Sequence, residues 1–127
     1  MTLQAVWLLA GLLAAHCVGD FSPLATARML EAKANGGPMT SIAGHAAVHA
    51  ALVGIVVALL AGPALSALAV AAGLVFVTHF GLDASRALLG RRYRVLNDTR
   101  ERAFWYALGL DQLGHGLVLV GVAAFIL

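Results

Sequence analysis

Charged residues are distributed along the chain so that long apolar stretches remain between them. Residues 1–19 and 34–82 contain no charged side chain, and residues 103–127 contain only Asp111. A helix needs about 20 apolar residues to cross about 30 Å of hydrocarbon, so residues 34–82 are long enough for two helices. Ala61-Gly62-Pro63 is the natural break, because proline can open a helix. The pattern predicts four spans near residues 2–20, 40–61, 64–90 and 100–127.

Capping signals predict what lies between these spans. Ser22-Pro23 is typical of a helix start, and Asn35-Gly36-Gly37-Pro38 of a helix end, so we expect a short interfacial helix at about residues 23–34. Asp98 and Glu101 have the spacing of a capping box, which predicts that the last span begins near Thr99. The expected fold is all-α, a single integral-membrane domain over residues 1–127. It is a four-transmembrane-helix up-down-up-down bundle with a short interfacial helix between spans 1 and 2.

The composition supports a membrane protein and limits its chemistry. Apolar residues make up 61% of the 127 residues and charged residues 11%, whereas soluble domains have about 45–50% and about 25%. The net charge of +2 does not indicate nucleic-acid binding. Cys17 is the single cysteine, which excludes an internal disulfide and a thiolate zinc cluster. Any metal site must therefore use nitrogen and oxygen ligands.

The first apolar stretch has an alternative interpretation as a cleaved signal peptide. Residues 1–19 have no basic segment at their start, and no clean small-residue cleavage pattern precedes Asp20. His16 stands where a lipoprotein needs a small residue before its acylated cysteine. These features favour a permanent first helix over the signal-peptide alternative.

The basic residues predict the orientation in the membrane. Two follow the first span and six lie in or beside the loop after the third; they are Arg28, Lys33, Arg86, Arg91, Arg92, Arg94, Arg100 and Arg102. Because lysine and arginine are retained in the cytoplasm, both loops are expected inside and both termini outside. The predicted location is the cytoplasmic membrane, with several passes. Topology explains the arginines, so no nucleic-acid partner is expected.

Histidine and aspartate occur in pairs four residues apart, one pair in each span. The pairs are His16 with Asp20, His45 with His49, His79 with Asp83, and Asp111 with His115. Residues at i and i+4 lie on the same helix face. A lone membrane histidine is more often a packing residue than a ligand. All five histidines belong to such pairs, and this favours a shared site.

The depth of the pairs predicts that they converge. In an alternating bundle all four lie in the leaflet beside the basic loops, which is the cytoplasmic one. Ionisable groups at membrane depth are costly unless they are paired or face a wet cavity. Imidazole and carboxylate ligands suit a divalent transition metal such as Zn²⁺, Mn²⁺ or Fe²⁺. The eight donors are enough for about two ions, or for one ion with aspartates orienting its histidines.

Few other polar residues lie near this predicted site. Arg86 has two interpretations: its side chain snorkels to the interface, or it binds an anionic headgroup. Gln112 and Thr78 adjoin ligand positions but are weak candidates, because neighbouring residues on a helix do not face the same way.

The ordered motifs resemble a known family. They read His16-Cys-Val-Gly19-Asp20-Phe21, His45-Ala-Ala-Val-His49, His79-Phe-Gly-Leu-Asp83 and Leu110-Asp111-Gln112-Leu-Gly-His115. Over nearly the whole chain they resemble the bacterial integral-membrane family called domain of unknown function 3307. The resemblance implies a small membrane protein without an established reaction. A more distant similarity to predicted membrane-bound metal-dependent hydrolases suggests an enzyme.

Three functions remain open at this point. The first is a metal-dependent hydrolase acting on a lipid-like ester or phosphoester, with Asp20, Asp83 or Asp111 as the catalytic base. The second is a transition-metal or proton transporter or sensor, which needs access from both sides. The third is a structural membrane protein whose buried pairs fix helix register. Membrane lipids are the expected partners, and a homo-oligomer is compatible with all three functions.

Overall fold

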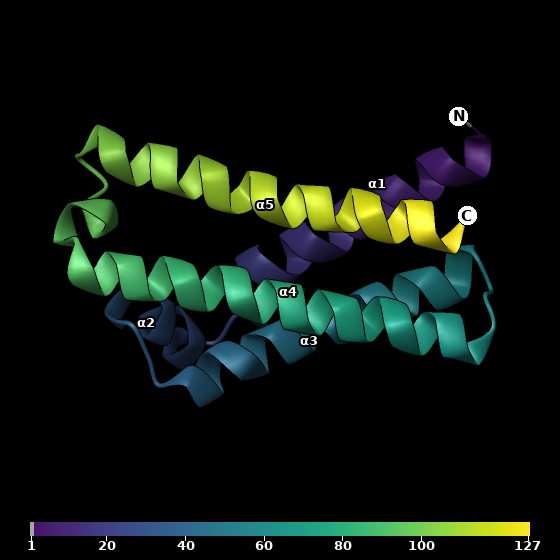
Figure 1. Ribbon diagram of the computed structural model, residues 1–127, viewed down its shortest axis with the longest axis horizontal. Helices are drawn as coiled ribbons and strands as arrows, with labels where there is room; N and C mark the ends of the chain where they lie inside the picture. The colour runs from purple at the N-terminus through teal and green to yellow at the C-terminus, as the bar shows by residue number, and fades with distance from the viewer. Residues whose placement is uncertain (1) are drawn as a thin grey trace.

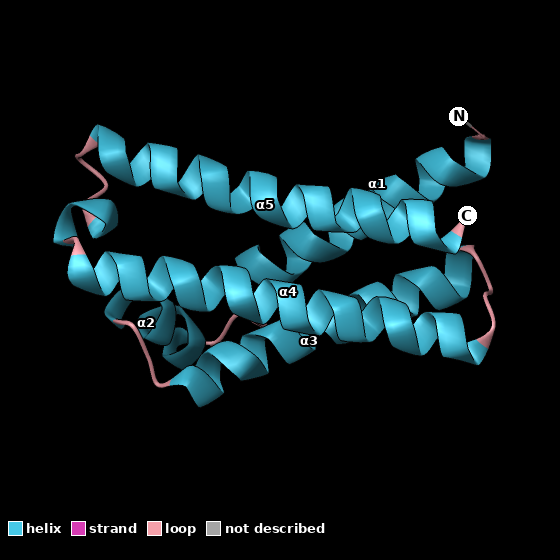
Figure 2. Ribbon diagram, in the orientation of Figure 1, coloured by secondary structure: helices cyan, strands magenta, loops and turns pink. Residues whose placement is uncertain are grey.

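Helices account for nearly all of the computed structural model, which describes residues 2–127. Within those residues there is no strand, and the elements are α1 (Leu3–Phe21), α2 (Ala27–Asn35), α3 (Met39–Leu60), α4 (Leu65–Arg92), the 3-10 helix η1 (Arg94–Asn97) and α5 (Arg102–Ile126) (Figure 2). Helices α1, α3, α4 and α5 are long and apolar enough to cross a membrane. The predicted fold class is confirmed.

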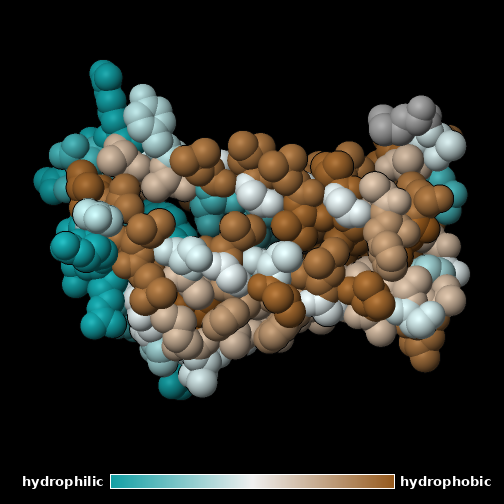
Figure 3. All heavy atoms as spheres, in the orientation of Figure 1, coloured by the Kyte–Doolittle hydropathy of each residue, from teal (hydrophilic) through white to brown (hydrophobic). Residues whose placement is uncertain are grey.

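The long helices alternate in direction, so the two ends of the bundle differ. Both termini and the α3–α4 connection lie at one end, which we call the terminal end; α2 and η1 lie at the other, the α2 end (Figure 1). Helix α3 packs against α1 and α4, and α5 packs mainly against α4. Hydrophilic residues gather at the α2 end, and hydrophobic residues cover most of the visible helical surface (Figure 3).

The short helix α2 begins later than predicted. Ser22 does not cap it: the Ser22 hydroxyl accepts a hydrogen bond from the Leu24 backbone N–H (3.2 Å) and its carbonyl accepts one from Ala25 (3.0 Å). These bonds close a turn, and Thr26 becomes the N-cap, with its hydroxyl accepting from the Met29 N–H. The predicted end is confirmed, since Gly36 closes α2 in the left-handed conformation at φ 81°.

The start of α5 also differs from the prediction, because the expected capping box does not form. The Asp98 carboxylate accepts hydrogen bonds from the backbone N–H (3.1 Å) and the guanidinium (2.9 and 2.8 Å) of Arg100. These bonds hold the pKa of Asp98 below its ordinary value. Asp98 is therefore used in a local turn, and α5 begins at Arg102 with no side-chain cap from Glu101.

Two apolar clusters lie on either side of a polar layer inside the bundle. The larger cluster fills the terminal half and consists of Leu8, Leu12, Val53, Val57, Ala71, Val75, Leu119, Val122 and Ala123. The smaller one lies under α2 and consists of Ala32, Ile42 and Ala87. All the predicted ligand positions occur in the helix segments between these clusters.

Candidate metal centre

The eight predicted ligand residues come together in the bundle interior. Helices α1, α3, α4 and α5 each contribute one pair on an inward face, as the i, i+4 spacing predicts. We call this set the polar cluster: His16, Asp20, His45, His49, His79, Asp83, Asp111 and His115. Seven of the eight are buried, and the Asp20 side chain is only 8% exposed.

One part of the polar cluster is organised around Asp20. Its Oδ1 lies 3.0 Å from Nε2 of His45 and 3.2 Å from Nε2 of His49. Together with His79, these residues offer four ligand atoms that all lie within 4.8 Å of one another. Three imidazoles and one carboxylate at this spacing are able to surround one divalent ion.

A second part is organised around Asp83, whose side chain is fully buried. Its Oδ2 lies 3.4 Å from Nε2 of His79, and its Oδ1 lies 3.7 Å from Nε2 of His115. The ligand atoms of these three residues also lie within 4.8 Å of one another. Because His79 belongs to both groups, the two candidate positions for an ion are adjacent.

The protonation of His115 is determined by its surroundings. Its Nδ1 lies 2.8 Å from the backbone carbonyl oxygen of Asp111. A carbonyl oxygen only accepts hydrogen bonds, so the proton of the neutral ring must be on Nδ1. Nε2 then carries a lone pair facing Asp83, and within residues 2–127 it has no hydrogen-bond partner. Metal-binding histidines typically donate their other ring N–H in this way.

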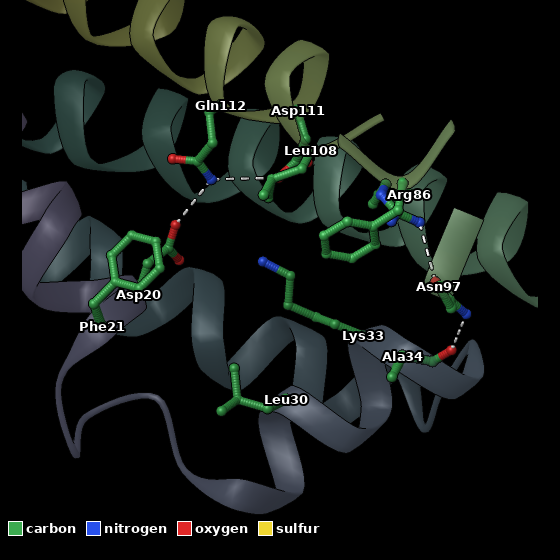
Figure 4. A pocket seen from close by; sticks show the side chains of 11 residues that line it. Asp20, Phe21, Leu30, Lys33, Ala34, Arg86, Asn97, Leu108, Asp111 and Gln112 are labelled. Carbon is green, nitrogen blue, oxygen red and sulfur yellow. Dashed lines mark hydrogen bonds between the residues drawn. The ribbon is translucent and has the colours of Figure 1, made fainter. Parts of the chain in front are cut away.

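Gln112 connects α1 to α5 at the edge of the polar cluster. Its amide N–H groups donate to Asp20 (3.2 Å) and Asp111 (3.4 Å), as Figure 4 shows. The amide oxygen therefore faces Nε2 of His16, at 3.3 Å, and that nitrogen must donate. His16 and Asp111 belong neither to the ligand group around Asp20 nor to the one around Asp83. Gln112 is thus more closely involved than the sequence indicated, whereas the Thr78 hydroxyl bonds to the Leu74 carbonyl of its own helix (2.7 Å).

A glycine allows the close packing of two imidazoles. The rings of His49 and His79 stack with their centroids 3.8 Å apart. On its other side the His49 ring lies against Gly19, where an added Cβ would come within 2.6 Å of Nε2 and 2.8 Å of Nδ1. Gly19 thus leaves the space in which His49 lies beside Asp20.

Lys33 also contacts the polar cluster, although from the sequence it was expected only to help orient the protein in the membrane. From α2 its Nζ reaches Oδ1 of Asp83 at 2.8 Å. Burial lowers the pKa of Lys33, but the attraction of Asp83 and the more distant Asp20 and Asp111 outweighs it, so the pKa is raised overall. One feature of the sequence pointed to this contact: Lys33 follows Met29 by four residues and therefore shares its helix face, and both residues are half-buried in α2.

A pocket of about 250 Å³ connects the polar cluster to the α2 end. Asp20, Asp111, Gln112 and Lys33 are among its lining residues, and the Lys33 side chain extends along the pocket from α2 (Figure 4). On the opposite side of the cluster a cavity of about 10 Å³ borders the apolar core, which is space for about one water. The cluster is therefore more open toward the α2 end.

Arg86 supports the wall of this pocket. Its guanidinium donates to the Leu96 carbonyl and to Oδ1 of Asn97. Asn97 in turn donates to the Ala34 carbonyl (2.8 Å), and Figure 4 shows both bonds of Asn97. These bonds join α4, η1 and the end of α2. Arg86 thus faces the pocket and does not simply extend toward the membrane surface.

Comparison with known proteins identifies the family but no close relative. Residues 8–127 match the model of the family described as "Protein of unknown function (DUF3307)", and that range includes all eight residues of the polar cluster. Searches of curated proteins and of solved structures gave no match. Because the match extends over nearly the whole chain, this protein belongs to that family, as the order of its motifs predicted.

Proposed function

We propose that the protein binds a divalent transition metal in the polar cluster. The observation that carries this proposal is a set of buried polar atoms that have no hydrogen-bond partner among the described residues. Nε2 of His79, Nε2 of His115 and Oδ2 of Asp83 have no aligned hydrogen-bond partner elsewhere in residues 2–127. Leaving such atoms unpaired costs about 1–3 kcal/mol each. A bound cation would satisfy all of them at once.

The charge of the polar cluster supports the same proposal. Three aspartates and Lys33 give a formal charge of −3 + 1 = −2 when the histidines are neutral. Unbalanced charge at membrane depth costs about 2.5–3.5 kcal/mol per group on insertion scales. One divalent ion would bring this sum to zero. The nitrogen and oxygen donors suit Zn²⁺, Mn²⁺ or Fe²⁺, and the two adjacent groups offer positions for about one or two ions.

The proposed reaction is metal-dependent hydrolysis of a lipid-like ester or phosphoester. A bound divalent ion supplies a water whose pKa is lowered toward about 7. Asp111 is the best-placed base, because it lines the pocket and lies outside both ligand groups. It would accept the proton of the attacking water and return it to the leaving alcohol oxygen. Asp20 lines the pocket too, but it faces His45 and His49, and Asp83 does not line the pocket.

A carrier or proton relay is the second candidate, and the terminal half of the bundle disfavours it. The residues there, including Val53, Val75 and Leu119, form a continuous apolar cluster. An ion or proton crossing a single chain would meet no polar side chain of that cluster. The third candidate, a structural role, predicts a stable bundle that takes up no metal.

The proposed setting is the bacterial inner membrane, with the α2 end in the cytoplasm and membrane lipids as substrate or partners. The basic residues near α2 and η1 support this orientation. A cysteine introduced for Arg92, in a Cys17→Ser background, should react with reagents on the cytoplasmic side alone. Labelling from outside would reverse the proposed orientation.

Elemental analysis of the purified protein tests metal binding. Wild type should contain about one or two transition-metal ions per chain, and the double variant Asp20→Asn/Asp83→Asn should contain almost none. The matched control Glu31→Gln/Glu101→Gln removes two exposed carboxylates outside the cluster and should retain the metal. Wild type that takes up no metal in several detergents would contradict the proposal.

Incubation of metal-loaded protein with mixed inner-membrane lipids tests the reaction. Cleavage products should appear with wild type and be lost with Asp111→Asn, which should retain its metal because Asp111 lies outside both groups. Metal flux into vesicles without any cleavage would favour the carrier instead.

A further inference from the structure

The pocket beside the polar cluster has the two-sided lining expected for an amphiphile. Phe21, Leu30, Phe104 and Leu108 provide apolar walls, and polar side chains make up most of the rest of the lining. Its volume of about 250 Å³ is smaller than the 300–1,000 Å³ typical of sites that enclose a whole small molecule. It has room for a headgroup, with the acyl chains remaining among the helices and the surrounding lipid.

Two cationic side chains reach this pocket from different elements. Lys33 enters from α2 and Arg86 from α4, and both line the cavity (Figure 4). The bonds from Arg86 to Leu96 and Asn97 use two of the five N–H donors of its guanidinium. A phosphate has several oxygens and can accept from an ammonium and a guanidinium at the same time. The pairing favours phosphate over a group with one acceptor.

Lys33 and a metal ion would compete for the same carboxylate. The Lys33 Nζ lies 2.8 Å from Oδ1 of Asp83, and Asp83 belongs to the ligand group with His79 and His115. A divalent ion held there would repel the ammonium at close range. The flexible four-carbon stem of lysine allows Nζ to turn into the pocket that it already lines.

Metal binding would also make the charge around the pocket more favourable for an anion. The polar cluster and the pocket lining together hold three aspartates against Lys33 and Arg86, a formal charge of −3 + 2 = −1 when the histidines are neutral. A divalent ion in the adjacent cluster makes the region positive, and a Lys33 side chain released from Asp83 adds a free donor. An anion would therefore be attracted mainly when metal is bound.

From this arrangement we infer that the pocket binds the phosphate of a membrane lipid headgroup through Lys33, and that metal binding creates this site by displacing Lys33 from Asp83. The inference rests on the metal site proposed above and identifies the substrate class as phosphate-bearing lipids. Because the two ligands favour the same arrangement, each raises the affinity for the other by the same factor. The apolar walls favour a lipid over free phosphate as the source of the anion.

Phosphorus NMR on the full chain in dodecyl maltoside tests this inference. Dioctanoylphosphatidic acid is titrated with protein that carries prebound zinc and no free zinc, and with protein treated with a chelator. Zinc should tighten the apparent Kd at least about tenfold, within the usual range of coupling between two sites. Inorganic phosphate at the same concentrations should bind more weakly. Equal binding of inorganic phosphate would overturn the lipid as the source.

Two variants of α2 isolate the role of Lys33. Lys33→Met retains the length of the side chain and removes its charge, so most of the gain produced by zinc should be lost. Arg28→Met removes a charge from the exposed face of the same helix and should leave that gain unchanged. A Lys33→Met protein that retains the gain, or an Arg28→Met protein that loses it equally, would overturn the inference.

A reciprocal measurement on wild type needs no variant to fold. Phosphatidic acid should raise the affinity of the protein for zinc by the same factor by which zinc raises its affinity for phosphatidic acid. Dioctanoylglycerol, which has no phosphate, should not change the affinity for zinc. Protein that takes up no zinc contradicts the metal site itself. Protein that binds zinc but binds phosphatidic acid equally with and without it contradicts only the inference about Lys33.

Discussion

The terminal half of the bundle and the half that contains the polar cluster are built by the same four helices with opposite chemistry. In the terminal half, residues such as Leu12, Val57 and Val122 fill the interior at 0% exposure. In the other half, a layer of histidine and aspartate lies between this apolar packing and the smaller apolar cluster under α2. Apolar packing can join membrane helices without ionisable groups, as it does in the terminal half. The proposed metal site gives a reason for retaining costly ionisable groups on only one side.

The largest contrast should come from two substitutions one helical turn apart on α5. His115→Phe retains a ring and removes both nitrogens. Losing a residue that only orients a ligand lowers metal affinity by up to about 100-fold, so losing the ligand itself should lower it by more than that. Leu119→Ala lies in the apolar cluster and should destabilise the fold by about 2 kcal/mol or more. The metal content of each folded chain should be unchanged in Leu119→Ala. Equal metal loss in both would remove the functional distinction between the halves.

A smaller effect on metal affinity is expected at Gly19, which leaves space for the His49 ring. In Gly19→Ala the new methyl group would collide with His49, so the ring must turn away from Asp20. We expect metal affinity to fall about 10- to 100-fold, measured by competition with a chelator. Gly54→Ala places the same methyl group in open space toward the terminal half and should bind metal as wild type does. Normal binding by Gly19→Ala would show that His49 is not a ligand.

Removing the amide that joins α1 to α5 should have a more moderate effect. Gln112→Leu eliminates the bonds to His16 and Asp20 while keeping similar volume. Asp20 then loses a donor that orients it, and metal affinity should fall about tenfold in a chelator competition assay. Gln112→Glu should be at least as harmful, because it adds a carboxylate beside Asp20 and Asp111. Unchanged affinity in both variants would exclude an orienting role.

The smallest change is expected at the α2 end, outside the polar cluster. Asn97→Ala removes the bonds to Arg86 and to the Ala34 carbonyl. Thermal unfolding should show that the free energy of unfolding falls by about 1 kcal/mol, the usual net contribution of a hydrogen bond. The metal content should stay as in wild type. A drop in metal content would mean that the pocket wall also maintains the ligand geometry.

The sequence was sufficient to predict the four long helices and the convergence of the histidine and aspartate pairs. Spacing of four residues places His79 and Asp83 on one face whatever the surrounding fold, and the cost of ionisable groups in lipid directs that face inward. Both arguments depend on local geometry and solvation alone. This is why they hold for all four pairs without any knowledge of how the helices pack.

What could not be predicted depends on contacts between distant segments. Lys33 reaches Asp83 across 50 positions of sequence, and only the docking of α2 on α3 and α4 brings them together. Gln112 contacts His16 because α5 lies beside α1 at that height. The starts of α2 and α5 were wrong for a local reason. Ser22 and Asp98 bond within their own turns, an alternative that the same residue types allow.

X-ray absorption spectroscopy of the purified, zinc-loaded protein tests the central claim most directly. We predict zinc bound to nitrogen and oxygen at about 2.0–2.1 Å, with the outer-shell scattering of several imidazoles, and this signal should be absent from Asp20→Asn/Asp83→Asn. A sulfur shell at about 2.3 Å, which would implicate the exposed Cys17, or a spectrum without imidazole scattering, would contradict a metal centre in the polar cluster.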